Sequence, residues 1–217
     1  MVGFDLQDAS GDARRLVLRA SRPAGESITA TDRAAEWAVI TMLSARGDVP
    51  LPTPAWYDQG PALGVPCFVV ERLDGVTVSR ALSGSDVAHR RPVSDKLCDL
   101  MVNVHSVPTE DLPPQLERPT DWDTHIDSQI DKWRQVERTG VEPDPFVRHL
   151  ANWLEDHKPT PAPLGLIHGE INNDNLMLGP DGTLSAVDWE FARIGDPRGP
   201  RLVRHRIGGG PTRSDGR

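Results

Sequence analysis

The feature that most constrains the fold is a polar loop that runs into a short hairpin near the end of the chain. Residues 176–178 are apolar and residues 184–187 mostly so, and Pro180-Asp181-Gly182 between them is a strong turn signal, so the two segments are expected to pair as antiparallel strands. The polar segment 169–175 enters this hairpin, and Asp188 leaves it. The entering loop and the exit carboxylate should therefore lie side by side at one end of the ribbon.

Side chains that carry oxygen are dense around this hairpin. They belong to Glu170, Asn172, Asn173, Asp174, Asn175, Asp188 and Glu190. Mg²⁺ prefers a few carboxylate or amide oxygens and takes its other ligands from water and phosphates. A separate carboxylate could accept the proton of a hydroxyl nucleophile. These groups suit phosphoryl transfer, in which the protein mainly positions reactants and neutralises charge. On these residues alone, a turn-rich surface hairpin with solvated acids is the alternative.

The first 72 residues are expected to form a small sheet with one helix. Alternation predicts a hairpin from residues 4–6 and 16–19, and further strands at 55–58 and 66–72. A helix is expected from about Thr31 to Arg46, where Gly47 closes it.

From residue 73 onward the chain is expected to be mostly helical, with a short strand at 166–167. Three stretches show the apolar spacing of amphipathic helices, and the third opens on the cap and first-turn proline Asp144-Pro145. The residues expected to face the core are Val93, Leu97, Leu100 and Val104, then Trp122, Ile126, Ile130 and Trp133, then Phe146, Leu150 and Trp153.

Composition narrows the class of protein. The net charge of −8 argues against nucleic acid and anionic membranes as partners, because both require a basic face. No apolar run approaches the roughly 20 residues that span a bilayer, and the start does not resemble a signal peptide. Cys67 and Cys98 lie in apolar contexts and are expected to be reduced core residues. A cytoplasmic protein is expected, and nothing in the sequence indicates the oligomeric state.

The motif around the hairpin resembles that of a known family. His168-Gly169-Glu170, with Asn175 five residues after Glu170 and Asp188 beyond the hairpin, is similar to the H-G-D-x-x-x-x-N … D pattern of the aminoglycoside phosphotransferase (choline-kinase-like) family. Gly195-Asp196-Pro197 fits the G-D-P that follows in this family.

Earlier segments resemble the same family less specifically. Val17-Leu18-Arg19 resembles the strand that carries the phosphate-binding cation, and Glu36 lies in the helix that should supply its ion-pair partner. Residues 69–75 resemble the hinge that receives adenine, and His105 to Pro108 resembles the family's helix-ending L-H-x-x-P. The match is closest to the branch related to the kinase-like domains of acyl-CoA-dehydrogenase-associated proteins.

The resemblance implies a protein-kinase-like, two-lobed α+β fold. A small β-rich lobe (residues 1–72) and a mostly helical catalytic lobe (residues 73–200) would hold ATP and Mg²⁺ between them. The reaction implied is transfer of the γ-phosphate to a hydroxyl group of a small molecule.

The resemblance also implies roles for individual residues. The implied catalytic residues are Glu170, as the base, and His168, as a brace for the loop; the implied Mg²⁺ ligands are Asn175 and Asp188; the implied nucleotide-binding residues are Arg19, Glu36, Val70 and Arg72. Arg19 can also be read as an exposed strand-end cation, and Glu36 as part of the polar face of its helix.

The sequence departs from the family pattern at three places. Position 170 is Glu where the family mostly has Asp. Only about fifteen residues precede the Val17-Leu18-Arg19 strand. The Arg/Gly/Pro-rich segment 201–217 is expected to be disordered and to derive from an out-of-frame reading. The chain is therefore expected to be truncated at both ends. The alternative to an enzyme is a degenerate kinase-like fragment that binds a nucleotide or a partner. An unrelated metal-dependent hydrolase is a third reading, but it lacks any further ligand set.

Overall fold

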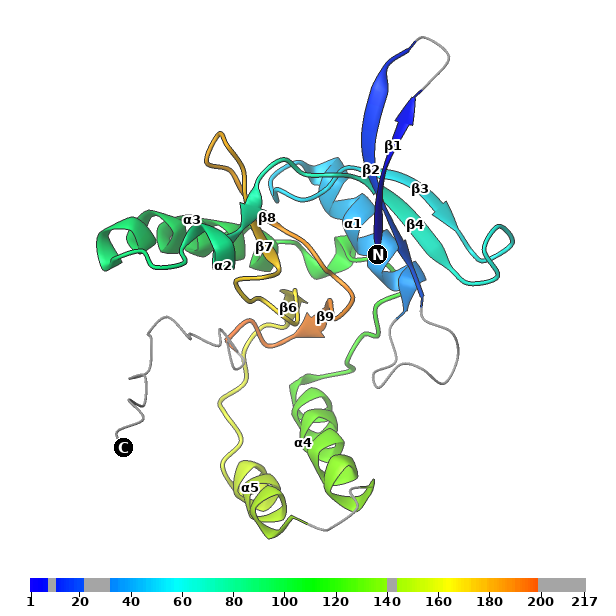
Figure 1. Ribbon diagram of the computed structural model, residues 1–217. Helices are drawn as coiled ribbons and strands as arrows, with labels where there is room; N and C mark the ends of the chain where they lie inside the picture. The colour runs from blue at the N-terminus through cyan, green and yellow to red at the C-terminus, as the bar shows by residue number, and fades with distance from the viewer. Residues whose placement is uncertain (8–10, 22–31, 140–143, 199–217) are drawn as a thin grey trace, which may run out of the picture.

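The computed structural model describes residues 1–7, 11–21, 32–139 and 144–198, which form a mixed α+β fold (Figure 1). The fold class expected from the sequence is confirmed. Part of the predicted first turn, the predicted helix start at Thr31 and the tail 201–217 lie outside the described residues, so the structure does not test those predictions.

A four-stranded antiparallel sheet occupies the N-terminal part, in the order β1-β2-β4-β3. Its strands are β1 (Val2–Gln7), β2 (Ala13–Ala20), β3 (Pro54–Asp58) and β4 (Cys67–Glu71). All four predicted strands are present. Pairing of β2 with β4 sets Arg19 opposite Phe68, near the end of β2 that leads to the helix.

Helix α1 (Arg33–Arg46) begins and ends where capping chemistry directs it. The Asp32 side chain accepts hydrogen bonds from the backbone N–H groups of Ala34 and Ala35, at 2.8 and 3.2 Å. Gly47 ends the helix in the left-handed conformation and donates its N–H to Leu43 O. The helix therefore starts beside the sheet at a defined residue, which places Arg33 and Glu36 in its first turn.

The C-terminal part combines helices with two small sheets. Its helices are α2 (Val78–Ala81), α3 (Val87–His105), the 3₁₀ turn η1 (Thr109–Asp111), α4 (Trp122–Thr139) and α5 (Pro145–Asp156). Its strands are β5 (Val76–Thr77), β6 (Gly165–Ile167), β7 (Leu176–Leu178), β8 (Leu184–Ala186) and β9 (Arg193–Gly195). The predicted β7–β8 hairpin is present, with β5 added to its edge, and β6 pairs with β9.

One buried apolar cluster runs through both parts of the described chain. It joins Leu43 of α1 and Phe68 of β4 to Leu100 of α3, Leu176 of β7 and Trp189 beyond β8. Burial of side chains this large supplies the main favourable term in folding, about 1.5–3 kcal/mol for each. The cluster thereby holds the hairpin and the N-terminal sheet in a shared core. The division into lobes at residues 72 and 73 stays a prediction.

The predicted core face of α5 is wrong. The exposed fractions of Phe146, Leu150 and Trp153 are 69%, 41% and 48%. Helix α5 packs on α4, and Ala151 is its buried residue. Figure 1 shows this helix pair lying apart from the sheets. Apolar periodicity correctly identified an amphipathic helix, but the apolar stripe faces solvent.

Two smaller expectations of burial are also wrong. Trp133 of α4 is 56% exposed, because α4 and α5 pack on each other and lie apart from the sheets (Figure 1). Cys67 is buried as expected, but Cys98 is exposed on α3. Within the described residues, no helix has both the length and the apolar character needed to cross a membrane.

Candidate functional site

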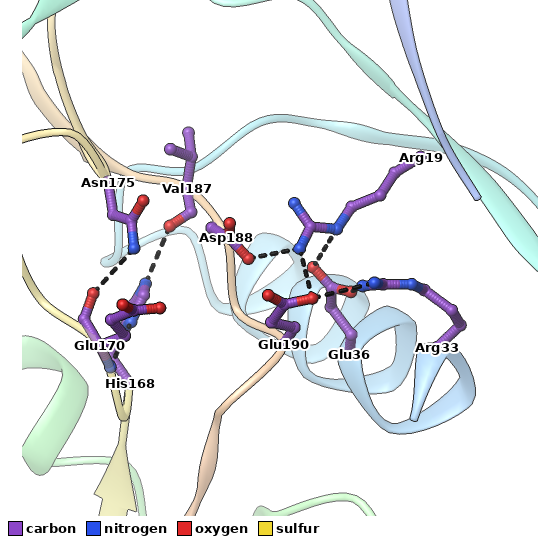
Figure 2. A network of polar contacts seen from close by, with 9 residues as sticks. All are labelled: Arg19, Arg33, Glu36, His168, Glu170, Asn175, Val187, Asp188 and Glu190. Atoms are coloured by element: carbon purple, nitrogen blue, oxygen red, sulfur yellow. Dashed lines mark hydrogen bonds and ion pairs between the residues drawn. The ribbon is translucent and has the colours of Figure 1, made fainter. Parts of the chain in front are cut away.

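The buried side chain of His168 holds the loop that follows β6 in place through hydrogen bonds. Its Nε2 lies 3.0 Å from Val187 O, and its Nδ1 accepts a 3.4 Å hydrogen bond from the backbone N–H of Glu170 (Figure 2). These partners require the proton on Nε2 of a neutral ring. Burial, together with packing against Trp189 at a ring-centroid distance of 4.4 Å, agrees with neutrality, since burial lowers the pKa of His168 to about 4.

Gly169 is required by the close approach of two chain segments. Its φ is +90°, and a Cβ at this position would lie 2.1 Å from Phe191 O. Any other residue would combine a left-handed conformation with a clash against backbone. The loop that carries Glu170 thus lies directly against the segment that follows β8.

Asparagine side chains shape the rest of the loop. Asn172 Oδ1 accepts hydrogen bonds from the N–H groups of Asp174 and Asn175, at 2.8 and 3.0 Å. Asn175 Nδ2 donates to Glu170 O at 2.9 Å, and Asn175 O accepts from Val187 N–H at 3.0 Å. Because the Asn175 Nδ2 is directed into the loop, the Oδ1 of the same amide is the atom that could ligate a cation.

Asp188 adopts a left-handed backbone conformation, with a φ of +67°, and it is the only non-glycine residue in the described part of the chain with a positive φ. Short polar residues tolerate this conformation better than others, but it costs free energy. Backbone strain of this kind concentrates at functional sites, which makes Asp188 a candidate functional residue.

Arg19 connects the N-terminal sheet to the hairpin exit. From β2, its Nη2 pairs with the carboxylates of Asp188 and Glu190, the latter at 2.8 Å. Its Nε forms an ion pair with Glu36 Oε1 of α1 at 3.1 Å (Figure 2). The predicted pairing of Arg19 with Glu36 is therefore present, and the two readings of these residues as exposed surface charges are wrong because both side chains are buried.

A second arginine, which the sequence analysis missed, completes the network. Arg33 Nη1 pairs with Glu36, and Arg33 Nη2 pairs with Glu190 Oε2 at 2.9 Å. The sequence held one signal: the spacing of three residues between Arg33 and Glu36 in a helix favours a pair. The link to Glu190, 157 residues further along the chain, had no local signal.

The environment shifts the proton affinities of three acids. Burial raises the pKa of Glu36 to about 7, against the lowering effect of Arg19 and Arg33. Burial alone would raise the pKa of Glu190, but hydrogen bonds and charges from the two arginines lower it overall. The pKa of Glu170, which is exposed, is raised by partial desolvation and then by the charges of Asp188 and Glu190.

The two predicted Mg²⁺ ligands, Asn175 and Asp188, carry one amide oxygen and one carboxylate, and the carboxylate is paired with Arg19. Among the described residues, no cluster of three or more His, Cys, Asp or Glu side chains is arranged to hold a metal ion. A donor set of one carboxylate and one amide nevertheless fits Mg²⁺, which keeps several waters and binds phosphate oxygens. The chemistry of these two side chains therefore suits that ion when a phosphate compound supplies further ligands, and their role as ligands stays a prediction.

The two predicted hinge residues lie within or next to β4. Val70 is buried and stands in register with Val17 on one side and Pro54 on the other. Arg72 donates its backbone N–H to Arg15 O at 2.8 Å, and its side chain pairs with Asp5. A direct adenine contact through the N–H of Arg72 would compete with that bond, and both roles stay predictions.

Comparisons with known proteins agree on one family. A sequence profile of the phosphotransferase enzyme family matches residues 6–198. Acyl-CoA dehydrogenase family member 10 of Mus musculus is 25% identical over 189 residues, which is 85% of this chain and 17% of that protein. The protein named "Probable acyl-CoA dehydrogenase IBR3" of Arabidopsis thaliana is 26% identical over 89% of this chain and 25% of its own length. The chain thus spans a quarter or less of these curated relatives.

Solved structures share the fold. A Ralstonia eutropha JMP134 protein assigned as an aminoglycoside phosphotransferase matches with a TM-score of 0.69 at 24% identity, over 90% of this chain and 57% of that one. A thermostable mutant of aminoglycoside phosphotransferase APH(4)-Ia, in a ternary complex with AMP-PNP and hygromycin B, matches with a TM-score of 0.63 at 16% identity, over 90% of this chain and 68% of that one. At these identities the likeness concerns the fold alone.

Proposed function

The chain belongs to the phosphotransferase enzyme family, and we propose that it transfers the γ-phosphate of ATP to a hydroxyl group of a small molecule. The observation that carries this proposal is the contact of Arg19 with both Glu36 and Asp188, which brings together β2, α1 and the segment that follows β8. A phosphate-binding cation, an acid that orients it and a carboxylate that can hold a metal ion are what phosphoryl transfer requires.

Each residue of the site has a role in this proposal. Arg19 binds ATP phosphate oxygens, and Glu36 orients its guanidinium through the ion pair. Asn175 and Asp188 hold Mg²⁺, which when bound would neutralise charge on the phosphates. His168 braces the catalytic loop through Val187 O and the Glu170 N–H. Val70 and Arg72 lie in and beside the strand that leads to the proposed adenine hinge.

Glu170 acts as the base. Its carboxylate accepts the proton of the acceptor hydroxyl while that oxygen forms a bond to the γ-phosphorus and the bond from that phosphorus to ADP breaks. The raised pKa of Glu170 suits this task because it brings the proton affinity of the carboxylate closer to the working pH. The longer side chain of Glu, compared with Asp, supports the proposal only if the acceptor lies correspondingly further from the loop.

The proposal concerns the reaction class and leaves the acceptor open. The solved relative with AMP-PNP carries hygromycin B as its second ligand. Another, aminoglycoside 2'-phosphotransferase-IIIa, carries GDP and matches with a TM-score of 0.58 over 58% of its chain. Any small-molecule acceptor of this chain therefore has to be found by assay, with ATP and GTP compared as donors.

The proposal is tested by the thermal stability of the chain with and without Mg-ATP. A ligand that binds only the native state stabilises it by RT ln(1 + [L]/Kd), or about 2.7 kcal/mol at a hundred times Kd. We expect an increase in Tm for the native sequence and no increase for Asp188→Asn. Asp174→Asn, which removes an exposed carboxylate from the loop that enters the hairpin, is the matched control and should keep the shift.

Turnover separates the enzyme from a module that only binds. Release of ADP from ATP would be measured against a panel of hydroxyl compounds, with Glu170→Gln as the inactive comparison. A Tm increase without turnover for any acceptor would support the degenerate binding module. The absence of any Tm increase would remove the nucleotide from the proposal altogether.

A further inference from the structure

Arg33 links the first turn of α1 to the segment that follows β8. One nitrogen of its guanidinium pairs with Glu36 of its own helix, and the other lies 2.9 Å from Glu190 Oε2. The Arg33 side chain is 7% exposed, so these contacts are made largely out of water. Ion pairs in such surroundings are far less screened than pairs at the surface.

The charges of the network are unevenly shared. Three acidic side chains face two guanidiniums, and Arg19 contacts all three of Glu36, Asp188 and Glu190. An Arg19 side chain that must compensate three buried or half-buried acids has little positive charge left for a phosphate. Arg33 contacts two of the same acids, Glu36 and Glu190.

We propose that Arg33 is a positioning residue, which holds Glu36 and Glu190 in place so that the guanidinium of Arg19 can exchange its contact with Asp188 for a nucleotide phosphate. The inference rests on the proposed function, because it assigns the phosphate contact to Arg19. It adds Arg33, as a second cation, to the pair of Arg19 and Glu36 that the resemblance implied. In this proposal Arg33 acts through the two acids that it contacts, not on a substrate or a metal ion.

The planar guanidinium explains why an arginine stands at this position. Its two terminal nitrogens reach one carboxylate from α1 and one from the segment after β8 at the same time. A lysine would carry the same charge as a single point and could compensate only one of these acids closely. The proposal therefore depends on the shape of the side chain as well as on its charge.

The test is calorimetric titration of the purified chain and its variants with Mg-ATP and, separately, with adenosine. Arg33→Gln should weaken Mg-ATP binding about tenfold or more, since each tenfold change is about 1.4 kcal/mol and charge-assisted hydrogen bonds are worth more than this. Adenosine affinity should change little, because the effect acts through Arg19 on the phosphates. Arg33→Lys should recover part of the loss.

Arg46→Gln is the matched control. It removes an arginine that pairs with Asp48 at the other end of the same helix, and it should bind both ligands as the native sequence does. Equal loss of Mg-ATP and adenosine affinity in Arg33→Gln would show a general structural role and overturn the inference. So would native Mg-ATP affinity in either Arg33 variant, and if Arg33→Gln does not fold, Arg33→Lys decides alone. Failure of the native sequence to bind Mg-ATP would instead refute the proposed function, and the inference with it.

Discussion

Two buried residues of the candidate site, Glu36 and His168, respond to pH in opposite directions. The pKa of Glu36 is raised from 4.5 to about 7, so the native state holds a proton that the unfolded state releases, and stability falls as pH rises from 4.5 to 7. The pKa of His168 is lowered from 6.5 to about 4, so stability rises with pH between these values. Each effect amounts to about 3 kcal/mol, and between pH 4.5 and 6.5 they oppose each other.

Glu36→Gln should uncover the effect of His168. Glutamine resembles the protonated acid, so the variant lacks the fall in stability that ionisation of Glu36 causes. Between pH 4.5 and 6.5 the free energy of unfolding of the variant should therefore rise by about 3 kcal/mol more than that of the native sequence. Urea unfolding at several pH values measures this. Glu71→Gln, at a partly exposed acid paired with Arg14, serves as the control. A Glu36→Gln profile parallel to that of the native sequence would contradict the prediction.

At the scale of elements, two tryptophans differ in what covers them. Trp153 is 48% exposed on α5, where it stacks on His157, whereas Trp189 is 1% exposed within the core cluster. Trp189→Ala should cost about 3–5 kcal/mol of stability. Trp153→Ala should cost less, about 1–1.5 kcal/mol, because about half of its side chain is already exposed. Urea unfolding measures both changes, and equal costs would mean that the face of α5 is buried in solution.

The same contrast shows which elements could be predicted from sequence. Local chemistry sufficed for the β7–β8 hairpin, for the α1 end at Gly47 and for the Asp144 cap of α5, because each signal lies within a few residues of its effect. The stripe of α5 was visible, but what a stripe packs against depends on distant parts of the chain. Periodicity therefore identified the helix and misjudged its burial.

At the scale of the whole molecule, the site combines what the sequence could and could not reveal. The proximity of the loop 169–175 to Asp188 was predicted from hairpin geometry, and the ion pair of Arg19 with Glu36 was predicted from the family resemblance. The contacts of Glu190 with both arginines join residues more than 150 positions apart, and the pairing of β6 with β9 has no turn signal between the strands. Contacts at such separations arise from the packing of the core.

The continuity of that core predicts how the molecule unfolds. Val39 of α1 and Ala186 of β8 belong to one buried cluster, whereas α4 and α5 pack on each other. Native-state hydrogen exchange should therefore give amides of α1 and β8 the same opening free energy, within about 1 kcal/mol, and amides of α5 a lower one. Cooperative opening is expected because neither the N-terminal sheet nor the hairpin can lose its partner without exposing shared apolar surface. Earlier exchange of α1 than of β8 would instead mean that the N-terminal sheet unfolds independently, and that the ion pairs of Arg19 join two separately stable units.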